Sequence, residues 1–268
     1  MFSLYKTLRV DRRSHFACVF LFIAFFTAAN AQSLQTVSRV IDGDTLVLQG
    51  GETVRLLGIN APEVAHYGHV AEEGGLLAKR YLQKLLVQHQ VYLEYDVEQT
   101  DHYKRSLAYV FLDNGLHVNI ELLKNGMAIL SLHPPNIKYA RVLSIAQQYA
   151  EIRKLGVWSQ VSHQPKLFTI QTARQLKNKW GRFNSRVKSI QYTKKGAKLY
   201  VSKRCYIWIP VSNYHYFTAL ESYLGREIEV RAWLKKWGRE WSMRVIHPSQ
   251  IILKPNGHQT IRRSLTID

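Results

Sequence analysis

Two short apolar segments, the first of which contains an Asp-Gly turn, constrain the fold of this chain most strongly. Residues 39–45 read Arg-Val-Ile-Asp-Gly-Asp-Thr, and residues 54–63 read Val-Arg-Leu-Leu-Gly-Ile-Asn-Ala-Pro-Glu. Apolar residues on both sides of an Asp-Gly pair predict two strands joined by a tight turn. The second segment predicts another strand that ends at Pro62, because proline has no backbone N–H to donate to a sheet.

Polar side chains fall at the ends of these predicted strands. Asp44, Asn60 and Glu63 carry oxygen atoms, which are the ligands that hard divalent cations prefer. Arg55 lies on the second strand, where a rigid backbone holds its charge in place. Oxygen ligands beside a fixed arginine indicate a site for a phosphoryl group. Each residue taken singly also has a structural interpretation, because Asp-Gly is a common hairpin sequence and Arg55 can pair with Glu63.

Positive charge is concentrated in the second half of the chain. The 268 residues carry a formal net charge of +18. Residues 163–268 contain 21 Lys+Arg and 5 Asp+Glu, whereas residues 32–162 contain 12 and 13. This distribution predicts that the second half attracts an anionic partner, such as nucleic acid, anionic lipid or polyphosphate.

The first 31 residues predict a secretory signal peptide. An apolar run covers residues 16–26, and Ala29-Asn30-Ala31 has the small-residue pattern of a cleavage site. The basic residues of this leader are Lys6, Arg9, Arg12 and Arg13. We therefore expect export to the periplasm or the extracellular space, with no membrane span after cleavage. An uncleaved N-terminal anchor is the alternative.

Residues 32–159 predict one mainly β domain with packed α-helices. A small closed barrel with packed helices accounts for the short strands and the helices between them. On the last long helix, the stripe expected to face the core consists of Val142, Ile145, Ala146, Tyr149 and Ile152. The further elements expected are helices over 69–90, 119–125 and 137–155, and strands over 91–98 and 107–112.

The remaining chain predicts a second, smaller OB-like domain. Residues 160–178 have the composition of a linker, residues 179–254 form the basic domain, and residues 255–268 form a polar tail. The expected elements are strands over 183–192, 198–203 and 205–210, a helix over 212–224, and strands over 227–234 and 241–246. Cys205 is expected to be a buried core residue, and two cysteines exclude a disulfide framework once Cys18 is removed.

Three motifs in this order resemble the thermonuclease family, typified by staphylococcal nuclease. They are I-D-G-D-T at 41–45, R-L-x-G-I-N-A-P-E at 55–63 and T-D-x-Y-x-R-S-L-A-Y at 100–109. The resemblance covers residues 36–159, about half of the chain. It implies a Ca²⁺-dependent phosphodiesterase built on an OB-type five-stranded barrel.

The resemblance also implies the metal ligands. Asp44 would bind Ca²⁺ directly, Asn60 stands where the family has a second aspartate, and Ala61 would offer its backbone carbonyl. Asn60 keeps an oxygen ligand but removes a negative charge. Because Ca²⁺ affinity follows the charge of its ligands, we expect weaker binding than an aspartate would provide.

The catalytic residues implied by the resemblance are Glu63, Arg55 and Arg105. Glu63 would activate or position the attacking water, and the two arginines would hold the scissile phosphate. The chemistry agrees, because two guanidinium groups match the equatorial oxygens of a five-coordinate phosphorane-like transition state. A carboxylate beside the water can take its proton.

The nucleotide pocket departs from the family pattern. Ser131, Leu132 and His133 stand where the family has nucleotide-stacking tyrosines. Tyr103 is kept in the arginine loop, and His102 stands where the family often has lysine. Tyr103 and His102 are therefore the predicted substrate contacts of this pocket.

The basic half interleaves cations with aromatic residues. Such a pattern is typical of OB folds that stack single-stranded bases beside a cationic track. In the alternative interpretation, the tryptophans and tyrosines fill the barrel core and the lysines face solvent. The residues predicted to bind nucleic acid are Lys203, Arg204, Trp208, Arg231, Trp233, Lys235 and Lys236.

Together these patterns predict an exported, Ca²⁺-dependent nuclease acting on DNA and RNA. Single strands are the expected preference, and no obligate protein partner is evident from the sequence. One alternative is a non-catalytic nucleic-acid or polyanion-binding protein, whose metal site Asn60 disables. Another is a protein that binds an anionic membrane or glycan through its basic half.

Overall fold

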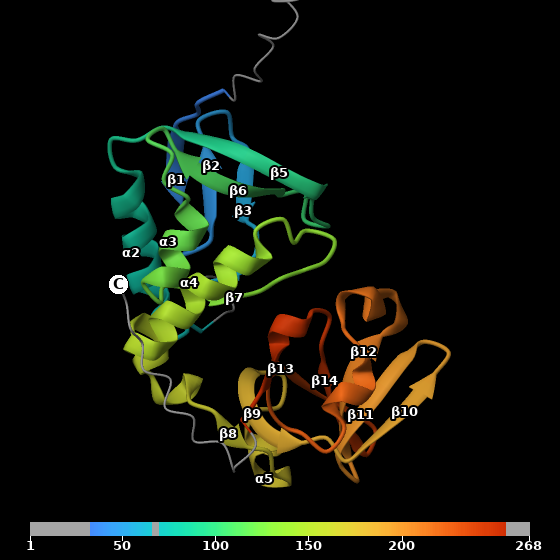
Figure 1. Cartoon of the computed structure of the whole chain (residues 1–268). Helices are drawn as coiled ribbons and strands as arrows, with labels where there is room; N and C mark the ends of the chain where they lie inside the picture. The colour runs from blue at the N-terminus through green and yellow to red at the C-terminus, as the bar shows by residue number, and fades with distance from the viewer. Residues whose placement is uncertain (1–32, 66–69, 256–268) are drawn as a thin grey trace, which may run out of the picture. The chain divides into compact units, whose positions relative to one another are not determined.

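The computed structural model describes residues 33–65 and 70–255 (Figure 1). The predicted signal peptide, the residues around His69 and almost all of the predicted tail lie outside this part of the chain. Within the described residues, no helix is long and apolar enough to cross a membrane. The structure is mainly β with packed helices, as predicted.

The first half is organised around a five-stranded sheet in the order β1-β2-β3-β6-β5. Strands β1 and β2 form the predicted hairpin, and β3 runs parallel to β6. Two further short strands, β4 and β7, pair with each other. The bounds are β1 (Val37–Val40), β2 (Thr45–Leu48), β3 (Thr53–Leu56), β4 (Ile59–Asn60), β5 (Val91–Thr100), β6 (Ser106–Leu112) and β7 (Ile129–Leu130).

Three α-helices pack against this sheet and close its core. They are α2 (Gly75–Leu86), α3 (Val118–Lys124) and α4 (Ala140–Arg153), followed by the 3₁₀ turns η1 (Gly156–Ser159) and η2 (Val161–His163) (Figure 1). One fully buried leucine from each helix, Leu82, Leu122 and Leu143, joins the core formed by the strands. These apolar contacts hold the strand ends that carry the candidate site.

The predicted core stripe of α4 is wrong for four of its five residues. Ala146 is buried, but Val142, Ile145, Tyr149 and Ile152 are exposed. The helix instead buries Leu143, Ala146, Gln147 and Ala150. Gln147 accounts for the error, because its buried amide oxygen accepts a hydrogen bond from the Leu130 N–H at 2.6 Å. A polar residue on the core face interrupts the apolar periodicity from which the stripe was predicted.

The second half contains a larger sheet in the order β10-β11-β12-β14-β13-β9-β8, with β15 also paired to β13. All its neighbouring pairs are antiparallel except β12 with β14 and β8 with β9. The bounds are β8 (Lys166–Leu167), β9 (Trp180–Arg186), β10 (Ser189–Thr193), β11 (Gly196–Ser202), β12 (Cys205–Pro210), β13 (Glu227–Trp237), β14 (Glu240–Arg244) and β15 (Ile251–Leu253). An OB-like barrel for this half stays a prediction.

The predicted helix over 212–224 is wrong. Two 3₁₀ turns, η3 (Val211–Tyr216) and η4 (Leu220–Tyr223), occupy this segment and are separated by extended residues. Phe217, Leu220 and Tyr223 are buried at a spacing of three. That spacing matches three residues per turn, and aromatic residues favour an α-helix only weakly.

A second apolar core lies under this sheet. Leu199, Ile207, Leu234 and Met243 are fully buried within it. Cys205 is buried and free, which confirms its predicted core role. The segment predicted as a linker contains β8 and the short helix α5 (Ile170–Gln175), whose Ala173 belongs to the same core. The helix η5 (Pro248–Gln250) precedes β15.

Candidate active site

Asp44 ends the β1–β2 turn and is buried among polar partners. Its Oδ2 accepts a hydrogen bond from the Ala61 N–H at 2.6 Å, and its Oδ1 accepts one from the Thr45 hydroxyl at 3.1 Å. Burial raises the pKa of Asp44 to about 7; the positive charge of Arg55 opposes this shift, and the nearby Asp42 adds to it. The site therefore holds a carboxylate whose negative charge is stabilised by any further cation.

Arg55 connects two of the predicted metal ligands. It lies on β3, opposite Thr45 of β2. Its Nη2 lies 3.0 Å from Asp44 Oδ2 and 3.1 Å from Asn60 Oδ1. Nη1 donates to the Leu56 carbonyl at 3.0 Å, which fixes the plane of the guanidinium. The structure thus brings Asp44, Arg55 and Asn60 into direct contact.

Close backbone packing explains why the turn and its neighbours meet here. A Cβ on Gly43 would lie 2.6 Å from the Cβ atoms of both Ala61 and Ala78. Only glycine at this position lets the turn approach β4 and α2 so closely. A Cβ on Gly75 would lie 2.2 Å from the Glu63 carbonyl oxygen, so the start of α2 also rests on the backbone of Glu63.

The backbone around Glu63 is held by Glu72. The Glu63 N–H donates to Glu72 Oε2 at 3.2 Å, and the Glu72 N–H donates to the Glu63 carbonyl at 2.9 Å. Glu63 is exposed. It therefore lies three residues beyond Asn60 in the chain, on a backbone that Glu72 holds in place.

Asp101 positions Arg105. Asp101 Oδ1 accepts from the N–H groups of Tyr103 and Arg105, each at 2.9 Å, and Oδ2 accepts from Arg105 Nε at 2.8 Å. These bonds lower the pKa of Asp101 in spite of its partial burial. Among the described residues, the two terminal nitrogens of Arg105 have no hydrogen-bond partner. This arrangement presents two donors on a fixed guanidinium, as a phosphate ligand requires.

The strand register places the loop of Arg105 beside the strand of Arg55. Arg55 pairs with Leu107 across the parallel strands β3 and β6, and Val54 pairs with Ser106. Arg105 immediately precedes Ser106, the first residue of β6. The loop that carries Arg105 therefore enters the sheet next to β3.

The predicted nucleotide contacts lie beside Arg105. The rings of His102 and Tyr103 are 3.8 Å apart between centroids, and the Arg105 guanidinium lies 5.4 Å from the Tyr103 centroid. Tyr103 is exposed. Its ring is therefore available to a ligand held by Arg105.

The donor set at Asp44 fits a hard cation. Asp42 Oδ1 accepts from the Asp44 N–H, and Arg55 Nη2 contacts both Asp44 Oδ2 and Asn60 Oδ1. The Ala61 N–H donates to Asp44, and its carbonyl is a further backbone oxygen close by in the chain. Carboxylate, amide and carbonyl oxygens are the donors that Ca²⁺ binds. In the described part of the chain, no group of three or more His, Cys, Asp or Glu side chains is placed to hold a metal. Any ion at this site would therefore depend on amide and backbone oxygens as well as carboxylates.

The predicted nucleic-acid residues of the second half are dispersed. Trp208, Trp233 and Lys235 line one large pocket. Arg231 lines it too, but its guanidinium is nearly buried in ion pairs with Glu151 and Glu229. The others do not line this pocket: Lys203 and Arg204 lie in the turn between β11 and β12, and Lys236 lies on β13.

Three residues of the site escaped the sequence prediction. Asp42 and Thr45 surround the Asp44 carboxylate, and Asp101 orients Arg105. Asp42 and Thr45 belong to the same turn motif as Asp44, and Asp101 belongs to the same loop motif as Arg105. Spacing within those motifs was the available signal, but the contacts themselves depend on the folded turns.

Comparison with known proteins agrees with this geometry. Residues 53–160 match the family model described as staphylococcal nuclease homologue. The thermonuclease of Staphylococcus intermedius is 38% identical over 125 residues, covering 46% of this chain and 74% of that protein. The thermonuclease of Staphylococcus hyicus is 34% identical over 134 residues, covering 49% and 78%. Endonuclease YncB of Bacillus subtilis is 36% identical over 129 residues, covering 46% and 61%.

The fold and these comparisons define a nuclease with an OB-type first half. The chain belongs to the staphylococcal nuclease (thermonuclease) family. The family model ends at residue 160, so most of the basic second half lies beyond it.

Proposed function

We propose that this protein is an exported, Ca²⁺-dependent nuclease that hydrolyses phosphodiester bonds of both DNA and RNA. The observation that carries the proposal is the contact of Arg55 Nη2 with both Asp44 and Asn60, with the loop of Arg105 leading into the strand next to that of Arg55. Oxygen donors for a cation and cationic donors for a phosphate thus adjoin each other.

Arg55 and Arg105 supply the phosphate-binding donors in this proposal. Charge develops on the equatorial oxygens as water attacks phosphorus in line with the leaving oxygen. Guanidinium groups stay protonated at any working pH, so both arginines stabilise that charge throughout. Asp101 holds the Nε of Arg105 and leaves its terminal nitrogens directed to the ligand.

Glu63 is the proposed base. A carboxylate at the rim of the site can accept a proton from the attacking water as the P–O bond forms. The leaving oxygen then departs with its electron pair and takes a proton from solvent. The backbone bonds between Glu63 and Glu72 hold the base at a constant distance from the strand end.

Asp44, Asn60 and Ala61 would hold the calcium ion, with Asp42 nearby. When bound, calcium neutralises phosphate charge and lowers the pKa of a coordinated water. Export supports this assignment because extracellular fluids supply calcium at concentrations that a weak site requires. The export itself rests on the leader pattern of residues 1–31.

Two variants test the assigned roles. Glu63→Gln removes the base but keeps the size of the side chain, and Arg105→Ala removes a phosphate donor. Both should reduce kcat on single-stranded DNA and RNA by about 100-fold or more in saturating calcium. Glu73→Gln and Lys104→Ala replace exposed neighbours and serve as matched controls. Full hydrolysis by Glu63→Gln and Arg105→Ala would contradict the roles assigned to these two residues.

A further inference from the structure

The second sheet carries an aromatic–cationic face, which we define as Tyr206, Trp208, Trp233, Lys235, Trp237 and Arg244. The register sets these side chains in rows across the strands. Trp208 of β12 pairs with Arg244 of β14, while Tyr206 and Lys235 both pair with Ser242. The intervening residues of these strands, such as Ile207, Leu234 and Met243, fill the core on the opposite side. Alternation therefore separates an apolar face from a face that mixes rings and cations.

Two of these four rings are exposed and accessible to a ligand, whereas Trp208 is partly exposed and Tyr206 is buried. Trp233 is 50% exposed and Trp237 is 65% exposed. Trp233 lies opposite Trp180 of β9, which also lines the pocket and extends the row of rings. Large exposed aromatic side chains grouped on one face mark a binding surface, because a soluble protein otherwise buries them.

The charges on this face are almost all positive. Lys195 and Lys198 line the pocket together with Arg244 and Lys235. Among the described residues that line the pocket there is no aspartate or glutamate. Glu240 pairs with Lys198 at 3.2 Å and offsets that one charge. The wall is therefore complementary to a polyanion.

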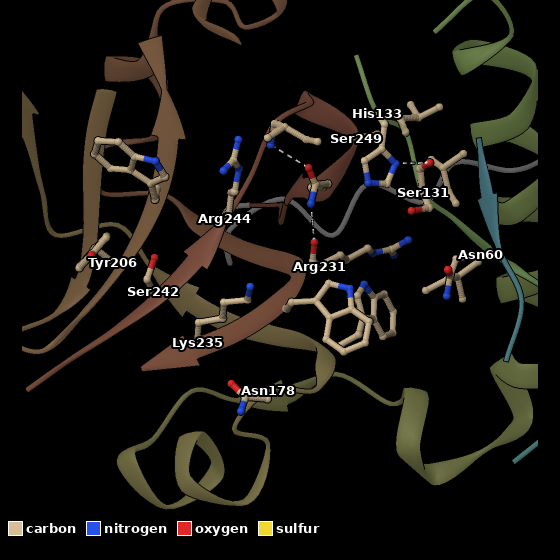
Figure 2. Close-up of a pocket in the computed structure, with 18 of the residues that line it drawn as sticks. Asn60, Ser131, His133, Asn178, Tyr206, Arg231, Lys235, Ser242, Arg244 and Ser249 are labelled. Carbon is tan, nitrogen blue, oxygen red and sulfur yellow. Dashed lines mark hydrogen bonds between the residues drawn. The ribbon is translucent and has the colours of Figure 1, made fainter. Parts of the chain in front are cut away.

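The face forms one wall of a cavity of about 1710 Å³. Typical sites for small ligands enclose about 300–1,000 Å³, so this cavity is large enough for several nucleotides. Figure 2 shows Tyr206, Ser242, Lys235 and Arg244 on the strands of the second sheet, with Asn60, Ser131 and His133 across from them. Tyr103 and His102 also line the cavity. The cavity is thus continuous with the predicted nucleotide contacts of the candidate active site.

A buried ion cluster holds the aromatic–cationic face beside that site. Arg231 donates to Glu151 of α4 through Nη1 at 2.5 Å and Nη2 at 2.8 Å. Arg182 donates to both oxygens of Glu229 and lies 3.4 Å from Glu151. Both guanidinium groups also lie within 6 Å of the buried Trp158 ring. The Arg231 guanidinium is therefore occupied by ion pairs with Glu151 and Glu229. Trp233, Lys235 and Trp237 follow it on the same strand and line the cavity.

We propose that the aromatic–cationic face binds single-stranded nucleic acid and guides it to the active site around Asn60 and Tyr103. This inference rests on the proposed nuclease function. Bases of a single strand can stack on tryptophan rings, whereas the bases of a duplex are already stacked on each other and cannot reach them. The lysines and Arg244 follow the phosphates, and the rings hold the bases.

The test measures affinity separately from cleavage. The probe is a fluorescent 12-residue oligothymidylate with phosphorothioate linkages, which resist hydrolysis, and binding is followed by fluorescence anisotropy. Trp237→Ala and Trp233→Ala should each weaken binding by roughly 5- to 100-fold, the loss of one stacked base. Lys235→Ala should weaken binding. It should also reduce the slope of log affinity against log salt concentration by about one, because one fewer counterion is released on binding.

Lys236→Ala is the matched control. Lys236 is exposed and adjacent to Lys235 in the chain, but it does not line the cavity. A duplex of the same length should bind more weakly than the single strand and respond little to the tryptophan variants. Thermal unfolding checks that each variant is folded. We expect little change in the unfolding temperature, because Trp233, Lys235 and Trp237 are exposed and contribute little to the core.

Several outcomes would overturn the inference. Unchanged affinity in both tryptophan variants would remove the stacking role, and equal losses in Lys235→Ala and Lys236→Ala would make the charge effect non-specific. Heparin bound as tightly as the oligonucleotide, with no effect of the tryptophan variants, would assign the face to sulfated glycans. Hydrolysis of a short dinucleotide substrate is measured in parallel. If the unmodified protein fails that assay but binds the probe as expected, the proposed function fails and the binding face stands.

Discussion

Arg55 and the buried Asp44 form a partly buried ion pair, in which Arg55 Nη2 lies 3.0 Å from Asp44 Oδ2. The same nitrogen contacts Asn60 Oδ1 at 3.1 Å. Arg55, a predicted phosphate-binding residue, therefore contacts two predicted calcium ligands. Because the Asp44 carboxylate is buried, its charge depends on a cation at this position. Arg55 thus has a structural role in addition to its proposed catalytic one.

Arg55→Lys separates these two roles. Lysine keeps the charge beside Asp44 but cannot make the contacts with Asn60 and Leu56 at the same time. We expect kcat on DNA to fall by about 100- to 1,000-fold, with a loss of about 1–3 kcal/mol in the free energy of unfolding. Denaturant unfolding and steady-state hydrolysis check the two effects. Arg39→Lys, on the exposed side of β1, should leave both unchanged.

Asn60→Asp tests the metal site directly. An additional negative charge next to Asp44 strengthens the attraction for a divalent cation. The calcium concentration at half-maximal hydrolysis of single-stranded DNA should therefore fall by at least about tenfold. Asn114→Asp adds the same charge in the distant turn after β6 and serves as the control. An unchanged calcium curve would place Asn60 outside the group of ligands.

Glu151→Gln tests the ion cluster between α4 and the second sheet. The variant leaves the nearly buried Arg231 and Arg182 with Glu229 as their remaining anion. Removing one partner from a buried cluster should cost about 3–5 kcal/mol, because an uncompensated charge stays away from water. Denaturant unfolding measures this loss. Glu121→Gln breaks the more exposed pair with Lys124, and we expect it to cost under about 1 kcal/mol.

His117 makes the first half sensitive to acid. Its ring packs among Tyr109, Phe111 and Tyr139, and within the described structure neither ring nitrogen has a hydrogen-bond partner. Burial lowers the pKa of His117 to about 4, with Glu94 opposing the shift. The unfolded chain therefore takes up this proton below about pH 6.5, whereas the folded protein takes it up only near pH 4. Stability should fall as the pH is lowered through this window.

His117→Phe should remove that part of the acid sensitivity. Between pH 7 and pH 4 the variant should lose about 2 kcal/mol less unfolding free energy than the unmodified protein, after allowing for the partial exposure of the ring. Urea unfolding at several pH values measures the difference. His215→Phe, which replaces an exposed histidine, should retain the original pH dependence. Parallel pH curves for the unmodified protein and His117→Phe would show that His117 is not the acid-sensitive group.

The strands of this protein could be predicted from local patterns more reliably than its helix faces. The β1–β2 hairpin follows from apolar residues around an Asp-Gly turn, and β12 follows from alternation over residues 205–210. The core face of α4 could not be predicted, since its buried Gln147 serves the backbone of β7. When a polar residue is buried because it hydrogen-bonds to a residue far away in the chain, the neighbouring sequence does not indicate that it is buried.

The candidate site shows the same division. The motifs containing Asp44, Arg55 and Asn60 place these residues on neighbouring strand ends, and the structure brings them into contact. Which cations of the basic half are free for a ligand could not be predicted. Arg231 and Lys235 lie four residues apart on one strand face, yet only Arg231 is ion-paired to Glu151. That pairing depends on α4, some eighty residues earlier in the chain.

The sequence alone determined the motifs of the candidate site, the mainly β architecture, and the division into a near-neutral half and a basic half. These features depend only on residue identity and short-range periodicity. Only the tertiary structure decided which tryptophans fill the core and which line the cavity. Trp241 is buried, whereas Trp233 and Trp237 of the adjacent strand are exposed beside Lys235. Strand register and the docking of α4 set these environments, and both arise from contacts between residues far apart in the chain.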